Sequence, residues 1–197
     1  MPYIKEHNVI FIHIPKTGGT SVEKAFGIYH DWDYEKLLYN KEEKINGITT
    51  APQHWTPNLI ENKLGKDTYS NAIKFTIIRN PYSRVLSEYF YKTGNTNLYN
   101  FDEWFFDYYS NIDNDHKIPQ HLFLQTHIDF IARTESLQDD FTRFVDQYNI
   151  KINPNLPYIN KSRYNNKLLI NYLSKDVISK INYIYKEDFD LLNYKTL

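Results

Sequence analysis

The sequence predicts an α/β fold in which helices flank a central parallel sheet of about four or five strands. Three short segments with strand patterns support this prediction, because each is followed by a helix-like pattern: an apolar run at residues 9–14, a core strand at residues 73–78 and an alternating segment at residues 127–132. Strands that are joined by helices usually pair in parallel. The length of 197 residues suggests one domain over residues 1–197, with two small lobes as the alternative.

Composition limits the classes of function to be considered. Hydrophobic residues make up 41% of the chain and aromatic residues 17%, which is enough for a sizeable core. The net charge of −1 gives no overall attraction to nucleic acid or acidic lipid, so neither is an expected partner. The absence of cysteine excludes disulfides and thiol chemistry. No apolar run is long enough to span a membrane, and the first residues do not resemble a signal peptide.

A turn rich in glycine and hydroxyl residues follows the first predicted strand. Pro15 ends the strand, and two glycines then allow the backbone to approach a ligand closely before a helix expected over residues 19–26. The free N–H groups and the positive end of such a helix form an anion site. The residues expected to contribute to that site are Lys16, Thr17, Gly18, Gly19, Thr20 and Ser21.

The spacing of this turn distinguishes it from two widespread phosphate loops. Lys16 precedes both glycines, whereas the lysine of a Walker A loop follows the last glycine. The pattern also differs from the G-x-G-x-x-G of dinucleotide-binding folds. An ordinary connection between a strand and a helix is the alternative, but the density of lysine, glycine and hydroxyl residues favours a ligand site.

His54 is the candidate proton acceptor. It stands between Pro52 and Pro57, after a short strand expected over residues 48–51, at a sheet edge where ligands collect. The ordinary pKa of histidine, about 6.5, suits removal of a proton at neutral pH. Taken alone, the pattern favours a histidine that packs beside Trp55 or caps the next helix.

A second anion-binding pattern follows the predicted strand at residues 73–78. Arg79 lies at the end of this strand, and Asn80 and Pro81 begin a helix on which Ser87 would face the same ligand. A guanidinium and a hydroxyl that converge in this way can bind one anion. The alternative is an Arg79 that forms a structural ion pair and a Ser87 that faces solvent.

The remaining segments carry local predictions. The loop at residues 111–116 lacks the glycine and the distal glutamate of an EF-hand, so calcium binding is not expected there. Ser136 should cap a helix, with Asp139 at its third position. Helical segments are expected around residues 34–43, 57–64, 101–109, 118–125, 164–173, 174–185 and 185–194.

Together these residues resemble the sulfotransferases that use 3′-phosphoadenosine 5′-phosphosulfate (PAPS), and most closely their carbohydrate branch. The segment Pro15-Lys-Thr-Gly-Gly-Thr-Ser21 is similar to the 5′-phosphosulfate loop of that family, and Arg79-Asn-Pro-x-x-Arg-x-x-Ser87 is similar to its 3′-phosphate motif. The resemblance runs from residue 9 to residue 194 and is weakest over residues 28–46 and 93–118. It implies a three-layer, P-loop-like fold.

The resemblance also implies roles for individual residues. His54 matches the catalytic base that the family carries in a loop after its second strand, which favours the catalytic interpretation. Lys16 would neutralise the charge that develops on the departing phosphate. A late basic and hydroxyl segment of the family closes over the nucleotide near the 3′-phosphate. In this sequence it corresponds to Lys161, Ser162 and Arg163, for which a solvated basic turn is the alternative.

These implications predict an enzyme that moves a sulfuryl group from PAPS to a hydroxyl of a carbohydrate or glycoconjugate, with PAP as the product and no metal. The alternatives are an ATP-dependent small-molecule kinase and a non-catalytic protein that binds a nucleotide or a glycan. A kinase is disfavoured because no metal-holding cluster of carboxylates lies beside either loop in the sequence. Golgi members of the family carry a membrane anchor that this sequence lacks, so a cytoplasmic protein of bacterial type is expected. The sequence does not indicate the acceptor or the oligomeric state.

Overall fold

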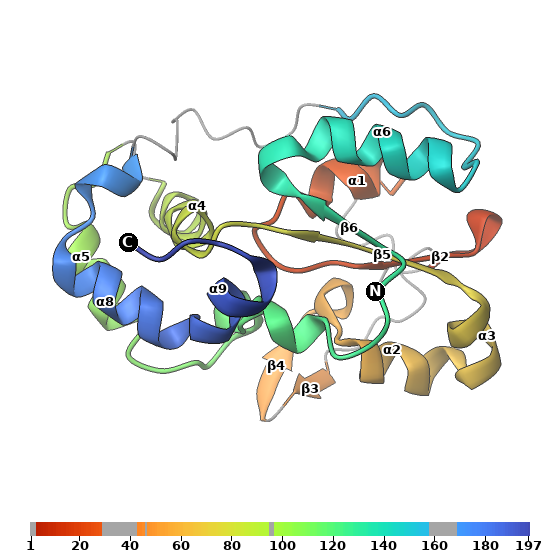
Figure 1. Ribbon diagram of the computed structural model, residues 1–197. Coiled ribbons are helices and arrows are strands. Elements are labelled where there is room, and N and C mark those ends of the chain that lie inside the picture. The colour runs from red at the N-terminus through yellow and green to blue at the C-terminus, as the bar shows by residue number, and fades with distance from the viewer. Residues whose placement is uncertain (1–2, 29–42, 46, 95–96, 158–168) are drawn as a thin grey trace.

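The computed structural model describes residues 3–28, 43–45, 47–94, 97–157 and 169–197 (Figure 1). Within these residues a four-stranded sheet has the order β1–β2–β5–β6. Strands β2, β5 and β6 are parallel, whereas β1 runs antiparallel to β2 at the edge. The predicted α/β fold with a largely parallel sheet is confirmed. The strands are β1 (Tyr3–Ile4), β2 (Val9–Ile12), β5 (Ile73–Ile78) and β6 (Phe130–Arg133).

One face of the sheet is built from phenylalanines. Phe75 of β5 is the register partner of Phe11 on β2 and of Phe130 on β6. These rings pack against Phe141 and Phe144 of helix α6, and the Phe75 and Phe144 rings stack with their centroids 4.2 Å apart. Figure 1 shows two helices on this face, which are α1 (Gly19–Ala25) and α6 (Leu137–Gln147).

The opposite face carries the alternate residues of the same strands, because successive side chains of a strand point to opposite sides. Ile10 and Ile12 of β2 pack there with Ile60, Tyr69 and Trp55. Both faces of the parallel strands are therefore covered, as parallel sheets require. The two helices on this face are α2 (Pro57–Leu64) and α3 (Lys66–Asn71).

A second group of helices lies beyond the carboxyl end of β5 (Figure 1). It has a core of its own, in which Tyr89, Phe105, Ile181 and Phe189 are buried. Among the described residues, no helix has the length and apolar character needed to cross a membrane. The members of this group are α4 (Pro81–Thr93), α5 (Phe101–Tyr108), α8 (Lys175–Ile184) and α9 (Lys186–Leu192).

Short elements connect these layers. The strand expected at residues 48–51 is present as β4, but it belongs to a separate hairpin with β3. The hairpin strands are β3 (Glu43–Ile45) and β4 (Ile48–Thr50). The 3₁₀ helices are η1 (Lys5–His7), η2 (Pro52–His54), η3 (Asp115–Lys117), η4 (Gln120–Phe123), η5 (Thr134–Ser136) and η6 (Ile170–Tyr172).

Two local predictions need correction. The helical segment expected at residues 118–125 is only the 3₁₀ helix η4, in which the N–H of Leu124 bonds to the carbonyl of His121, three residues back, at 2.9 Å. The carboxylate of Asp188 accepts the N–H groups of Gln120 and His121 at its start, each at 2.8 Å. Ser136 precedes α6 without a side-chain cap, because its hydroxyl donates to the Asp140 carboxylate at 2.9 Å instead.

Other local predictions shift in their bounds or lie outside the described residues. The third strand begins at residue 130 rather than 127, since pairing with β5 starts at Phe130. The helices expected over residues 34–43 and 164–173 fall largely outside the described residues; of the second, residue 169 is helical and residues 170–172 form the 3₁₀ helix η6. The helices predicted over residues 57–64, 101–109, 174–185 and 185–194 are confirmed within one or two residues at each end.

Candidate active site

The turn between β2 and α1 is fixed by a buried threonine. Thr17 is fully buried, and its hydroxyl donates a hydrogen bond of 2.8 Å to the carbonyl of Ile14. Its own carbonyl accepts a hydrogen bond of 2.6 Å from the hydroxyl of Thr134. Lys16 and Gly18 adopt positive φ angles of 67° and 95°, which glycine tolerates better than lysine. These hydrogen bonds within the protein therefore fix the conformation of the turn.

Gly19 begins α1 and lies against a histidine. A Cβ added at Gly19 would come within 2.3 Å of the His13 ring, so the glycine is required by internal packing. The His13 ring is itself held, because its Nδ1 is 2.8 Å from the carboxylate of Glu23. Thr20 and Ser21 follow in the first turn of α1 and are half-buried. The first N–H groups of a helix lack partners within the helix, so this turn offers backbone donors beside two hydroxyls.

The ammonium group of Lys16 lies among other cations. Its Nζ is 3.8 Å from the centroid of the Tyr91 ring. Burial lowers the pKa of Lys16 to about 8; the charge of Glu88 opposes this shift, and those of Arg79 and Arg84 reinforce it. The surplus of positive charge around this group suits an anionic ligand, which would stabilise the protonated amine.

The side chain of Arg79 contacts the glycine turn. Its Nη1 donates to the carbonyl of Lys16 at 2.9 Å, and its backbone N–H donates to the side chain of Gln120 at 2.9 Å. Burial lowers the pKa of Arg79 to about 10, so the guanidinium remains charged at neutral pH. Ser87 lies half-buried on α4, and among the described residues no hydrogen bond links it to Arg79. Their convergence on one anion stays a prediction.

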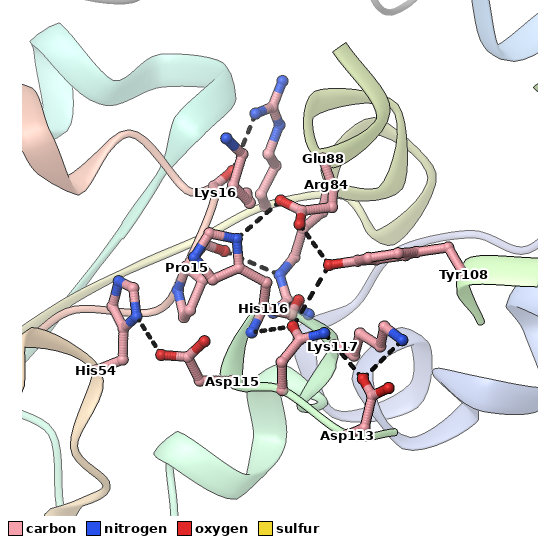
Figure 2. A network of polar contacts seen from close by, with 12 residues as sticks. Pro15, Lys16, His54, Arg84, Glu88, Tyr108, Asp113, Asp115, His116 and Lys117 are labelled. Atoms are coloured by element: carbon pink, nitrogen blue, oxygen red, sulfur yellow. Dashed lines mark hydrogen bonds and ion pairs between the residues drawn. The ribbon is translucent and has the colours of Figure 1, made fainter. Parts of the chain in front are cut away.

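Arg84, one turn into α4, joins two parts of the site. The residue is buried, and its Nε donates to the carbonyl of Pro15 at 3.0 Å while its Nη2 donates to the carbonyl of His116 at 2.9 Å. Figure 2 shows this guanidinium between the glycine turn and the segment that follows Asp113. A planar guanidinium suits such a double contact, because its donors are fixed in a fork.

His54 is buried and paired with a carboxylate. It lies in η2 with 6% of its surface exposed, and its Nδ1 is 2.7 Å from Oδ2 of Asp115 (Figure 2). The same oxygen accepts the backbone N–H of Ala51 at 3.0 Å. The carboxylate is ionised, because the hydrogen bond and charge of His54 outweigh burial and lower the pKa of Asp115 to about 2.

The protonation of His54 follows from these contacts. Burial lowers the pKa of His54 to about 4 although Asp115 acts in the opposite direction, so the imidazole is neutral at pH 7. An ionised carboxylate can only accept, so Nδ1 carries the proton and Nε2 carries the lone pair. The His54 ring lies 4.9 Å from the His13 ring that packs on Gly19. His54, a potential proton acceptor, therefore contacts the His13 ring, which in turn lies against Gly19 of the glycine turn.

His116 forms a second pair of the same kind. Its Nδ1 is 2.8 Å from Oε2 of Glu88, whose other oxygen accepts the Tyr108 hydroxyl at 2.6 Å. Glu88 is 1% exposed; the hydrogen bond of His116 outweighs burial and lowers the pKa of this carboxyl. The His54 and His116 rings are 5.3 Å apart. His54, Asp115 and His116 offer ligand atoms within 4.8 Å of one another, a set that could hold a cation.

Sequence reasoning missed Asp115, His116, Glu88 and the role of Arg84. Arg84 stood inside the quoted arginine–serine pattern, so the motif itself was a signal for it. The segment with Asp115 and His116 was considered only as a calcium loop, and nothing in its local pattern indicates two histidine–carboxylate pairs. Three residues predicted to close over a nucleotide lie outside the described part of the chain: Lys161, Ser162 and Arg163.

Comparison with known proteins places this geometry in a family. The protein-family model described as "Sulfotransferase family" matches residues 3–195. No curated protein and no solved structure matches the chain. The matched range spans the positions of both anion-binding patterns and of the two histidine–carboxylate pairs.

Proposed function

Because the chain belongs to the sulfotransferase family, whose members transfer sulfuryl groups, we propose that it moves a sulfuryl group from PAPS to a hydroxyl of a carbohydrate or glycoconjugate. The observation that supports this proposal best is the neutral His54. Asp115 holds its ring, which contacts the His13 ring that lies against Gly19 of the glycine turn. The carbohydrate acceptor is proposed from the sequence resemblance described above.

The residues around the turn fit the anionic donor. Three cationic side chains lie at the turn, those of Lys16, Arg79 and Arg84. The pKa of Lys16 is lowered by burial, and a bound anion would raise it again. In the proposed complex, the backbone N–H groups from Thr17 to Thr20 and the hydroxyls of Thr20 and Ser21 hold the 5′-phosphosulfate, while the Thr17 hydroxyl stays bonded to the carbonyl of Ile14 and fixes the turn. Arg79 and Ser87 hold the 3′-phosphate and so select PAPS over nucleotides that lack it.

The chemistry requires a base and a charge at the leaving oxygen. PAPS supplies an activated sulfuryl group whose leaving group is the phosphate of PAP. The acceptor oxygen forms a bond to sulfur while the bond between sulfur and the bridging oxygen breaks, and the bridging oxygen keeps the electron pair. His54 takes the acceptor proton on Nε2, Asp115 stabilises the resulting imidazolium, and Lys16 neutralises the charge on the departing oxygen.

Ligand binding and transfer test this proposal. Calorimetric titration with PAP, ADP and ATP should show the tightest binding for PAP, and PAP should raise the midpoint of thermal unfolding by mass action. Transfer of labelled sulfate from PAPS to a panel of glycosides should depend on His54 and Lys16. Magnesium-dependent hydrolysis of ATP without PAP binding would instead support the kinase alternative. Tight PAP binding without transfer to any acceptor would support a non-catalytic protein.

A further inference from the structure

His116 is fixed as firmly as the proposed base but has no part in the chemistry described above. Helix α4 holds it twice, because Glu88 binds its Nδ1 at 2.8 Å and Arg84 binds its backbone carbonyl at 2.9 Å. Glu88 is a fully buried carboxylate, and burying a charge is costly unless it is paired. Glu88 is paired on one oxygen with the Tyr108 hydroxyl and on the other with the His116 ring, so the buried carboxylate fixes the orientation of that ring.

The contacts of His116 define its free atom. Since the ionised carboxylate of Glu88 can only accept, Nδ1 of His116 carries the proton in the neutral ring. Nε2 is then an acceptor, as it is in His54. Two imidazoles with the same tautomer and rings 5.3 Å apart therefore provide two acceptors for O–H groups side by side.

The surroundings place His116 on the open side of the site. Its side chain keeps 18% of its surface exposed, and its ring lies 5.8 Å from that of Tyr91, which is 63% exposed. Tyr91 also contacts the Lys16 ammonium, so it borders the proposed reaction centre. An accessible aromatic ring beside two hydrogen-bond acceptors suits a ring-shaped molecule with an apolar C–H face and several hydroxyls.

We propose that His54 and His116 together bind the acceptor and select hydroxyl groups on adjacent carbons, as in a saccharide; this inference rests on the sulfuryl transfer proposed above. His54 accepts the hydroxyl that reacts, and His116 accepts the neighbouring hydroxyl and holds the acceptor in place. His116 exchanges no proton with the acceptor. An alcohol with a single hydroxyl leaves Nε2 of His116 without its partner, which weakens the complex.

The matched acceptors trans-1,2-cyclohexanediol and cyclohexanol test the selection, with methyl glycosides as saccharide probes. In the wild-type protein, kcat/KM for the diol should exceed that for the alcohol by about 10- to 100-fold. His116→Asn keeps an amide donor near Glu88 but loses the outward acceptor, so it should remove most of this preference. His116→Gln places its amide near the position of Nε2 and should retain more of the preference than His116→Asn. His127→Asn is the control, because His127 is 81% exposed and pairs with Asp129 on the surface.

The affinity for PAP, measured by calorimetry, separates the two proposals. It should stay within about twofold in every variant, since His116 is proposed to bind the acceptor and not the nucleotide. The inference is overturned if His116→Asn lowers transfer to the diol and to the alcohol equally, or if the wild-type protein does not distinguish them. PAP binding without transfer to any diol or glycoside also overturns it. A protein that binds no PAP overturns the proposed function, and this inference with it.

Discussion

Asp115→Asn removes the negative charge beside His54 and keeps the shape of the side chain. The asparagine oxygen can still accept the Nδ1–H of His54 and the N–H of Ala51, which the carboxylate oxygen accepts at 2.7 and 3.0 Å. What is lost is the stabilisation of the imidazolium that forms when His54 takes the acceptor proton. Asp115→Asn therefore measures how much the negative charge of Asp115 contributes to the function of His54.

The size of the effect can be bounded from the structure. A hydrogen bond to a charged group contributes about 1 kcal/mol more than one between neutral groups, which is a lower bound of roughly fivefold in kcat. Two unit charges about 4 Å apart interact by about 4 kcal/mol at an effective dielectric constant near 20, which gives an upper bound of roughly 10³-fold. We expect kcat to fall within this range, with the affinity for PAP unchanged within about twofold.

The assay is transfer from labelled PAPS at saturating acceptor, with Asp113→Asn as the matched control. Asp113 lies two positions away, pairs with Lys117 at 2.8 Å and is 64% exposed at its side chain, so its replacement should leave kcat within about twofold. Asp115→Asn should have no further effect in a His54→Ala background, because the two residues act as one unit. An undiminished kcat in Asp115→Asn, or the same loss with and without His54, would refute the proposed pairing.

Three further predictions concern the same site. The kcat/KM for PAPS should fall as pH rises through about 8, because Lys16 loses its proton there. In Lys16→Arg the residual kcat/KM should show no such fall at alkaline pH. A fall that persists in this variant would contradict the role given to Lys16. Gly19→Ala should lower the free energy of unfolding by about 1–3 kcal/mol through the clash with His13, and a double-mutant cycle with His13→Ala should show a smaller cost, measured by denaturant unfolding. Zn²⁺ should inhibit competitively with the acceptor but not with PAPS, because the imidazoles of His54 and His116 are 5.3 Å apart, close to the roughly 5 Å expected for two imidazoles on one tetrahedral ion. If Zn²⁺ inhibits His116→Asn as strongly as it inhibits the wild-type protein, this zinc site is excluded.

The parts of the fold that the sequence predicted are those with local patterns. The strand before Pro15 is a short apolar run, and the strand before Arg79 ends shortly before Asn80 and Pro81; both lie in the central sheet as expected. Strand β1 was not predicted, because two residues are too few to show an alternation. Segment 118–125 forms only the one-turn 3₁₀ helix η4, and the carboxylate that binds its first N–H groups, Asp188, is 68 positions from Gln120 in the sequence.

The proposed catalytic arrangement was predictable only in part for the same reason. His54 was identified by its place between two prolines and by family resemblance, yet its partner Asp115 is 61 positions away in the sequence. Glu88 and His116 are 28 positions apart, and neither lies in a pattern that points to the other. Contacts of this kind depend on how the layers pack, so no periodicity or spacing encodes them.

Helix α4 does more than carry Ser87, which is proposed to bind the 3′-phosphate. Arg84 and Glu88 are four positions apart and so lie on the same face of the helix. Arg84 holds the carbonyls of Pro15 and His116, and Glu88 holds the His116 ring. The helix that follows Arg79 thereby fixes the distance between the glycine turn and the proposed acceptor side of the site. Nucleotide contacts and acceptor contacts would then share one rigid element, because any shift of α4 moves the turn and His116 together.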